Sequence, residues 1–280
     1  MPSNVDQGTY FGNLQYYKYY ILPTVQRLFG KSSKRPKNKH SEMVLNLLNL
    51  FALQGTRTTW QLAKVRLADD ISALRTKEKE YRRLLVGRVD RGKHYRGLLE
   101  LGLIVKDGFN LERAPANKYR LSLHGILYSI DVLDFDEIQI DKIAENYSTV
   151  LPKIFGKWKF LKKIEPKTYN KLKGLAKGLL LDNMSMSEDM DNPINELMSY
   201  LQIKYHRKYE NISEEELAEQ ISYWFYTSLL ISRPNKRKPI SKLMEILEKD
   251  QELFLWYMIF YRETKLFYEK RLGSILRFSV

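Results

Sequence analysis

The chain contains no cysteine and only four histidines among its 280 residues. Without cysteine it can form neither a disulfide framework nor a thiolate metal site, and a cysteine nucleophile is excluded. The histidines are scattered and show none of the spacings typical of a zinc hydrolase. A serine nucleophile motif and a dinucleotide-binding glycine motif are missing as well. We therefore expect no catalytic residues, no metal site and no cofactor.

Long apolar runs are also missing. The longest, at 223–231 and 254–261, are less than half of the ~20 residues that a membrane-spanning helix needs. The first ten residues lack the charged-then-apolar order of a signal peptide. We expect a cytoplasmic protein without membrane contact. We interpret the aromatic run 256–261 as part of a central core helix, and a contact within an oligomer, such as a homodimer, is the alternative.

The positive charge is concentrated in the first half of the chain. The net charge is +14 in total, with +6 in residues 1–40, +6 in 41–133 and +2 in 134–280. Clustered Lys and Arg favour a polyanionic partner, because they release counterions from phosphates. A basic surface that merely keeps the protein in solution is the alternative.

Two segments precede the most informative part of the sequence. Residues 9–29 are rich in tyrosine, and apolar side chains at spacings of three and four predict a helix. Residues 30–40, GKSSKRPKNKH, are basic and contain no large apolar residue, so they predict a linker or a basic arm. An arm would contact DNA phosphates or a minor groove, whereas a linker would only be solvated. The arm hypothesis assigns phosphate contacts to Lys34, Arg35, Lys37 and Lys39.

Residues 41–134 predict a compact set of helices. Ser41 is a candidate N-cap for a helix that Gly55 would end. Thr58 and Gln61 have the spacing of a capping box, which predicts a short second helix with Thr58 and Thr59 facing a phosphate. Residues 71–88 continue in helical period, with leucines and Tyr81 on one side and cations on the other.

The segment 87–93 matches the G-x-x-x-x-G-K pattern of a phosphate-binding loop. That loop needs a Ser or Thr after the lysine and a buried strand before it, whereas this chain has His94 and a charged helical pattern. We therefore interpret 91–101 as a recognition helix beginning at Gly92. Arg91, Lys93, His94 and Arg96 would then contact base edges in the major groove. The alternative, a recognition helix at 75–88, remains open.

The next segment predicts a β-wing. Residues 103–109 are extended and apolar, with a turn expected at Asp107 and Gly108, and residues 117–123 alternate between apolar and polar side chains. Ser122 is a plausible cap for a closing helix, and Lys118 would anchor a phosphate.

The stretches TTWQLA, RGLLELGLIVKDG and NKYRLSLHGILYSI resemble winged helix-turn-helix transcription regulators of prokaryotes, in particular winged-helix proteins of ammonia-oxidising archaea. The resemblance covers residues 41–134 and implies binding of double-stranded DNA. One departure is that residues 66–89 separate the two helices that ordinary winged helices join by a tight turn. The predicted DNA-binding residues are Thr58, Thr59, Arg88, Arg91, Lys93, His94, Tyr95, Arg96, Lys118 and Arg120, together with Lys34, Arg35, Lys37 and Lys39.

Residues 135–280 predict an all-helical domain for dimerisation or for sensing a signal. Pro152 would open one helix, and a long helical region from Ser241 would break near Asp250. The fold class is thus mainly α, with residues 1–40 as an N-terminal helix and arm, a winged helix at 41–134 and a helical C-terminal domain. We expect a DNA-binding transcription regulator. A protein-interaction adaptor and, less favoured, a nucleic-acid-processing enzyme are the alternatives.

Overall fold

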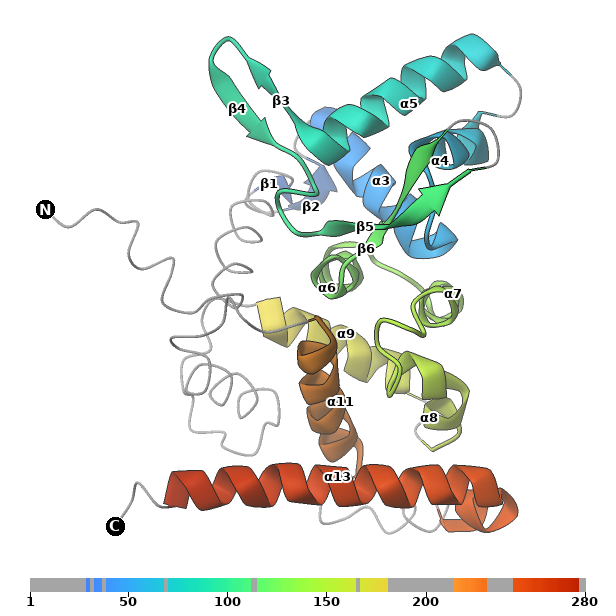
Figure 1. Cartoon of the computed structure of the whole chain (residues 1–280), viewed down its shortest axis with the longest axis vertical. Helices are drawn as coiled ribbons and strands as arrows, with labels where there is room; N and C mark the ends of the chain where they lie inside the picture. Colours follow the sequence, from blue (N-terminus) through green and yellow to red (C-terminus); the bar gives the residue numbers. More distant parts are fainter. Residues whose placement is uncertain are drawn as a thin grey trace, which may run out of the picture.

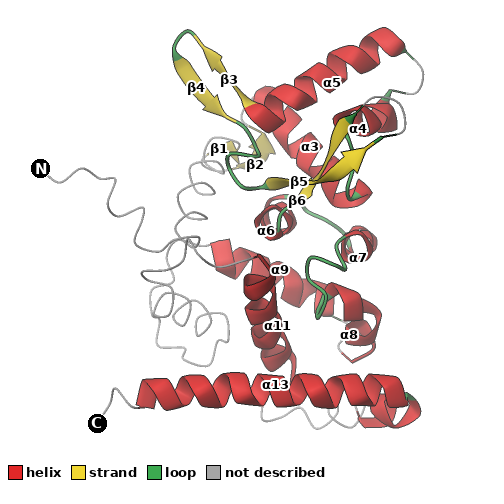
Figure 2. Cartoon of the chain, viewed as in Figure 1, coloured by secondary structure: helices red, strands yellow, loops and turns green. Residues whose placement is uncertain are grey.

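The computed structural model describes residues 29–30, 33–36, 39–67, 70–111, 115–164, 167–180, 214–230 and 244–276. In these residues the chain is mainly helical, which confirms the predicted class at that level, and its strands form three separate two-stranded antiparallel sheets. Figure 1 places α3, α4 and α5 at one end of the molecule and α13 across the opposite end, and Figure 2 shows the strands confined to the first of these ends.

The elements follow the chain as a run of strands and helices in the first half and helices alone in the second. Residues 9–28 of the helix predicted at 9–29, and Lys37, lie outside the described residues, and Phe29 lies in a strand. The bounds are β1 (Phe29–Gly30), β2 (Ser33–Pro36), α3 (Lys39–Gln54), α4 (Thr59–Arg66), α5 (Ile71–Val86), β3 (Gly87–Asp90), β4 (Lys93–Arg96), β5 (Ile104–Asn110), β6 (Ala116–Leu121), α6 (Leu123–Val132), α7 (Glu137–Asn146), η1 (Phe155–Lys157), α8 (Trp158–Ile164), α9 (Thr168–Leu180), α11 (Glu214–Leu230) and α13 (Gln251–Leu276).

Local signals set the end of α3 and the start of α4. Gly55 ends α3 with φ +68, as predicted, but Ser41 lies inside the first turn and is not the cap. The helix begins at Lys39, two residues before the predicted cap. The predicted capping box of α4 is confirmed, because Thr58 and Gln61 each accept a hydrogen bond from the other's backbone N–H.

The segment predicted as the recognition helix 91–101 is a β-hairpin followed by a turn, so that prediction was wrong. Strands β3 and β4 pair in register and are joined by Arg91 and Gly92, with φ +49 and +76. Two adjacent left-handed residues are the conformation that a two-residue hairpin requires. After the hairpin, the N–H groups of Leu98 and Leu99 bond the carbonyl oxygens of Leu84 and Leu85 at 2.9 and 3.1 Å, which holds the returning chain against the end of α5.

Strands β5 and β6 form the antiparallel pair of strands expected in the segment that was predicted as a wing. The turn expected at Asp107 and Gly108 is instead a bulge within β5, where the register shifts between Lys106 and Phe109 and Gly108 has φ +90. A bridge between Arg57 and Tyr119 ties the segment before α4 to the wing. Helix α6 then begins at the predicted cap, Ser122, whose hydroxyl accepts the Gly125 N–H at 3.0 Å.

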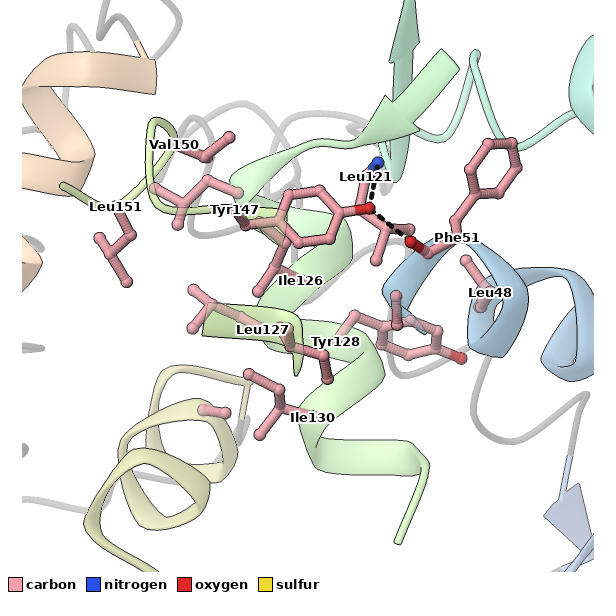
Figure 3. Packing of buried hydrophobic residues seen from close by; sticks show 14 of the residues in the cluster. Leu48, Phe51, Leu121, Ile126, Leu127, Tyr128, Ile130, Tyr147, Val150 and Leu151 are labelled. Atoms are coloured by element: carbon pink, nitrogen blue, oxygen red, sulfur yellow. Dashed lines mark hydrogen bonds between the residues drawn. The ribbon is translucent and has the colours of Figure 1, made fainter. Parts of the chain in front are cut away.

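One hydrophobic core runs from the N-terminal helices into the C-terminal ones. Figure 3 shows α6 at its centre, with Leu48 and Phe51 of α3 on one side and Leu151 on another. Tyr147, which follows α7, donates its hydroxyl to the Phe51 carbonyl at 2.7 Å and accepts the Leu121 N–H at 3.3 Å. The core is therefore continuous across residue 134.

The C-terminal half is helical, as predicted in outline. Pro152 does not open a helix, because residues 150–154 form turns around the buried Leu151 and α8 begins only at Trp158. The predicted break at Asp250 is confirmed, and its carboxylate accepts the Leu253 N–H as the cap of α13.

The side chain of Lys153, in the turn before η1, contacts both α11 and α13. Lys153 Nζ lies 2.8 Å from carboxylate oxygens of both Glu219 and Glu263 and over the rings of Tyr223 and Phe260. The predicted core position of the aromatic run 256–261 holds for half of its residues. Phe260 is 3% exposed and Trp256 and Tyr257 are partly buried against the core, whereas Met258, Ile259 and Tyr261 are exposed, because α13 packs against the protein along one side only.

Candidate nucleic-acid interface

The outward side of α5 carries a group of cations. Arg75, Lys79, Arg82 and Arg83 fall within about 100° of the helix circumference at 3.6 residues per turn, and all four are exposed. The opposite side packs into the core through buried side chains. This amphipathic pattern turns all four cations toward solvent. The buried residues of α5 are Leu74, Tyr81, Leu84 and Leu85.

The two acidic residues within α5 do not share this outward face. Glu78 lies at its edge with 15% of its side chain exposed, accepts the Thr59 hydroxyl at 2.9 Å and pairs with Arg82. Glu80 pairs with Lys77 at 2.8 Å. The outer surface of α5 therefore keeps an excess of positive charge.

The hairpin β3–β4 lies beyond the C-terminal end of α5, as Figure 1 shows. Arg88 and Arg91 are exposed, and Val89 between them is 73% exposed. The register places Arg88 opposite Tyr95, Val89 opposite His94, and Gly87 opposite Arg96. The structure therefore brings the predicted residues 88–96 together at one place, although on a hairpin and not on a helix.

Two predicted phosphate ligands are not available at the surface. Thr58 and Thr59 are 3% and 6% exposed. The Thr58 hydroxyl accepts the Gln61 N–H, and the Thr59 hydroxyl donates to Glu78, so both are engaged inside the protein. This corrects the expectation that they face a phosphate. Capping spacing predicted the helix start but not the packing of α5 over it.

The expectation that Arg120 contacts DNA is also corrected, because its side chain binds groups within the protein. Its guanidinium donates to Glu214 at 2.8 Å and to the Leu121 carbonyl at 2.9 Å, and it lies 3.6 Å from Asp107. Burial alone would lower the pKa of Arg120, but the hydrogen bond and charge of Glu214 outweigh it and raise the pKa. Lys118, on the same strand, is half-buried.

The predicted basic arm is in part a second small hairpin. Lys34 and Arg35 lie in β2, which pairs with β1, and Lys39 is the exposed first residue of α3. These residues therefore do not form one free arm. The pairing was hidden in the sequence, because GKSSKRPKNKH has the composition of a linker.

The predicted site did not include the residues that define this surface, Arg75, Lys79, Arg82 and Arg83, although the alternative recognition helix at 75–88 contains them. Their signal was present, since the cations recur at i, i+4, i+7 and i+8 with leucines on the other side. In the part of the chain that the structure describes, no group of His, Asp and Glu is placed to hold a metal ion. Among the described helices, including α13, none has an apolar stretch that would span a bilayer.

Comparison of the chain with protein-family models, with curated proteins and with solved structures found no match.

Proposed function

We propose that α5 is the recognition helix of a winged helix-turn-helix domain and that the protein binds double-stranded DNA as a transcription regulator. Three features support the domain: α3, α4 and α5 succeed one another, the link between α4 and α5 is short, and the pair β5–β6 follows with a bridge to Arg57. In this proposal the segment that an ordinary winged helix lacks is the hairpin β3–β4. It follows the recognition helix and does not separate the two helices of the motif.

The observation that carries the proposal is the outward face of α5. Its four exposed cations would neutralise phosphates or donate to guanine O6 and N7 in the major groove. The same face also exposes Ile71 and Val86, at 62% and 65%, which are suited to contact thymine methyl groups. A face that combines cations and apolar contacts fits a base-reading surface better than a merely solvated one.

The hairpin adds a second contact. Arg88 and Arg91 continue from the end of α5, where a duplex lying along α5 would present its next phosphates. Base readout is thus assigned to α5, and phosphate anchoring to the hairpin. The wing contributes less than the sequence suggested, because Arg120 is occupied by Glu214.

The test is duplex DNA binding, measured by fluorescence anisotropy at several salt concentrations. The variant Arg75→Ala/Lys79→Ala/Arg83→Ala removes three outward cations and leaves the Arg82–Glu78 pair in place. The matched control removes three exposed lysines from α7 and α8, with the variant Lys142→Ala/Lys159→Ala/Lys163→Ala. Both variants lose the same formal charge, so long-range attraction changes by a similar amount.

We expect the α5 variant to bind more weakly and its log–log salt slope to fall by about 0.9 for each lost phosphate contact, whereas the control keeps the wild-type slope. A smaller change of slope with lost sequence preference would assign the cations to bases. Equal weakening in both variants, or no binding even at low salt, would refute the proposal.

A protein-interaction adaptor is the second candidate, because the wing exposes two large apolar side chains. Phe109 is 51% exposed and Leu111 is 80% exposed, next to the loop of the wing. Apolar side chains at a loop tip are typical of protein contacts. If DNA binding fails, a partner protein that binds the wild-type protein should no longer bind the double variant Phe109→Ser/Leu111→Ser. The same partner should still bind the α5 variant.

A further inference from the structure

Helix α13 has an apolar face that no described part of the chain covers. Leu255, Met258, Ile259 and Leu266 are 56%, 46%, 60% and 55% exposed. At 3.6 residues per turn they fall within about 100° of the helix circumference. Trp256 and Phe260 occupy the opposite side and pack on Tyr226 of α11. An exposed, contiguous apolar stripe of this kind marks an interaction site.

Two opposite charges flank the part of this stripe that Leu255, Met258 and Ile259 form. Glu252 precedes these residues and Arg262 follows them, with Leu266 one turn beyond, and both charges are exposed. Neither forms an ion pair with another described residue. An apolar stripe that is acidic toward one end and basic toward the other is complementary to itself when one copy is turned end over end.

We infer that this face binds the same face of a second copy of the chain, with the two α13 helices antiparallel. Position 257 would lie at the two-fold axis, because Leu255 and Ile259 are symmetric about it, as are Glu252 and Arg262. Leu255 then lies at the height of Ile259 of the second copy, and Glu252 at the height of its Arg262. One interface thus buries Leu255, Met258 and Ile259 and gives both charges a partner.

The position of α13 determines what such a dimer does. Figure 1 shows α13 and α5 at opposite ends of the molecule. A two-fold axis at the outer face of α13 therefore places the two α5 surfaces at the far ends of the dimer, facing away from each other. If the proposed DNA binding holds, on which this step rests, the dimer joins two separate duplex segments and does not read adjacent half-sites on one straight duplex.

Self-association is tested first and without DNA, by sedimentation velocity over a range of concentrations. Ile259→Glu should make the protein monomeric or weaken the dimer by ~30-fold or more, as expected for a central apolar contact. Ile138→Glu is the matched control, since Ile138 lies on α7 with 68% exposure and is far from the stripe. Circular dichroism must show both variants folded.

The charges test the direction of the helices. Glu252→Arg and Arg262→Glu should each weaken the dimer, because each brings like charges together, and the double variant should restore it. A parallel pair would show neither the loss nor the rescue. The inference is refuted if the wild-type protein is monomeric at every concentration, if Ile259→Glu still dimerises, or if the single charge variants dimerise as strongly as the wild type.

Bridging is tested separately, by capture of a labelled duplex on an immobilised duplex. The wild-type protein should capture it, and Ile259→Glu should bind one duplex without capturing the second. Dimerisation without any DNA binding would refute the proposed function and leave the interface standing. Single-duplex binding by a monomeric wild-type protein would refute the interface and leave the proposed function standing.

Discussion

Replacing Gly97 by alanine should displace the hairpin β3–β4 from the end of α5. An added Cβ would lie 2.2 Å from the Leu85 carbonyl oxygen, 2.3 Å from the Gly87 nitrogen and 2.4 Å from the Val86 carbonyl carbon. All three are backbone atoms, and real Cβ atoms essentially never approach others closer than 3.0 Å. The chain must therefore move by about 1 Å in a close-packed region.

The magnitude follows from what this movement breaks. Leu98 and Leu99 would lose their hydrogen bonds to the carbonyl oxygens of Leu84 and Leu85, at about 1 kcal/mol each. Overpacking of a tight site costs a further ~1–3 kcal/mol. The total is about 3–5 kcal/mol, a large part of the ~5–15 kcal/mol by which typical domains are stable.

Two other glycines serve as controls of known direction. Gly174 in α9 has no neighbouring atom within 4 Å of an added Cβ, so Gly174→Ala should stabilise the helix by about 1 kcal/mol. Gly92 also has open space but a φ of +76, so Gly92→Ala should cost about 1–2 kcal/mol through backbone strain alone. The expected order of stability is Gly174→Ala, wild type, Gly92→Ala and Gly97→Ala.

The assay is urea denaturation followed by far-ultraviolet circular dichroism, with free energies of unfolding extrapolated to water. DNA binding of Gly97→Ala is measured below its unfolding range, and it should be weaker because Arg88 and Arg91 are displaced. A free energy of unfolding within about 1 kcal/mol of the wild type would refute the packing of the hairpin against α5.

Two further substitutions test the C-terminal core. Lys153→Met should lower the free energy of unfolding at neutral pH by about 2 kcal/mol. Lys153 lowers the pKa of Glu219 through a hydrogen bond. The difference in stability between the wild type and Lys153→Met is therefore fully present above ~4.3, the pKa of the carboxyl group in the unfolded chain. In an acid titration of stability, this difference should shrink as the pH falls through the lower pKa of the folded protein. Tyr147→Phe removes the bond to the Phe51 carbonyl and should cost about 1–2 kcal/mol by thermal unfolding. The exposed Tyr261→Phe should cost nothing measurable, and equal effects of the two tyrosine variants would contradict the assignment.

Features that depend on a few neighbouring residues were predictable from the sequence. The capping box at Thr58, the cap at Ser122 and the break at Asp250 each need only a side chain within three residues of a backbone N–H. The continuous period of α5 was equally visible. These parts of the fold follow from local hydrogen bonding and from helical spacing, so an isolated sequence contains enough information for them.

The hairpin was missed because its decisive contact is not local to it. The apolar spacing after Gly92 fits a helix, and a two-residue turn at Arg91 and Gly92 fits a hairpin, so the local pattern favours neither. The close approach of Gly97 to the end of α5 and the bonds made by Leu98 and Leu99 favour the hairpin. Those contacts exist only once α5 is in place.

Thr58, Thr59 and Arg120 were predicted wrongly for a similar reason, because the availability of a side chain depends on distant partners. Arg120 is engaged by Glu214, which lies 94 positions away, and Thr59 by Glu78 on the next helix. A cation in the sequence indicates a possible contact, but the folded chain decides which cations remain exposed. Arg75 and Lys79 meet that condition and Arg120 does not.

The cations on the outward face of α5 repel one another, and only one of them has an ion-pair partner among the described residues. Arg75 and Lys79, and Lys79 and Arg83, stand four residues apart, where like charges destabilise a helix by about 0.2–0.5 kcal/mol per pair. Arg82 has Glu78 as a partner, but the other three have no ion pair with a described residue. The helix withstands this repulsion because its inner face is buried through Leu74, Tyr81, Leu84 and Leu85. A bound polyanion would turn the same repulsion into attraction, which is the physical reason to place the ligand on this face and not on the wing.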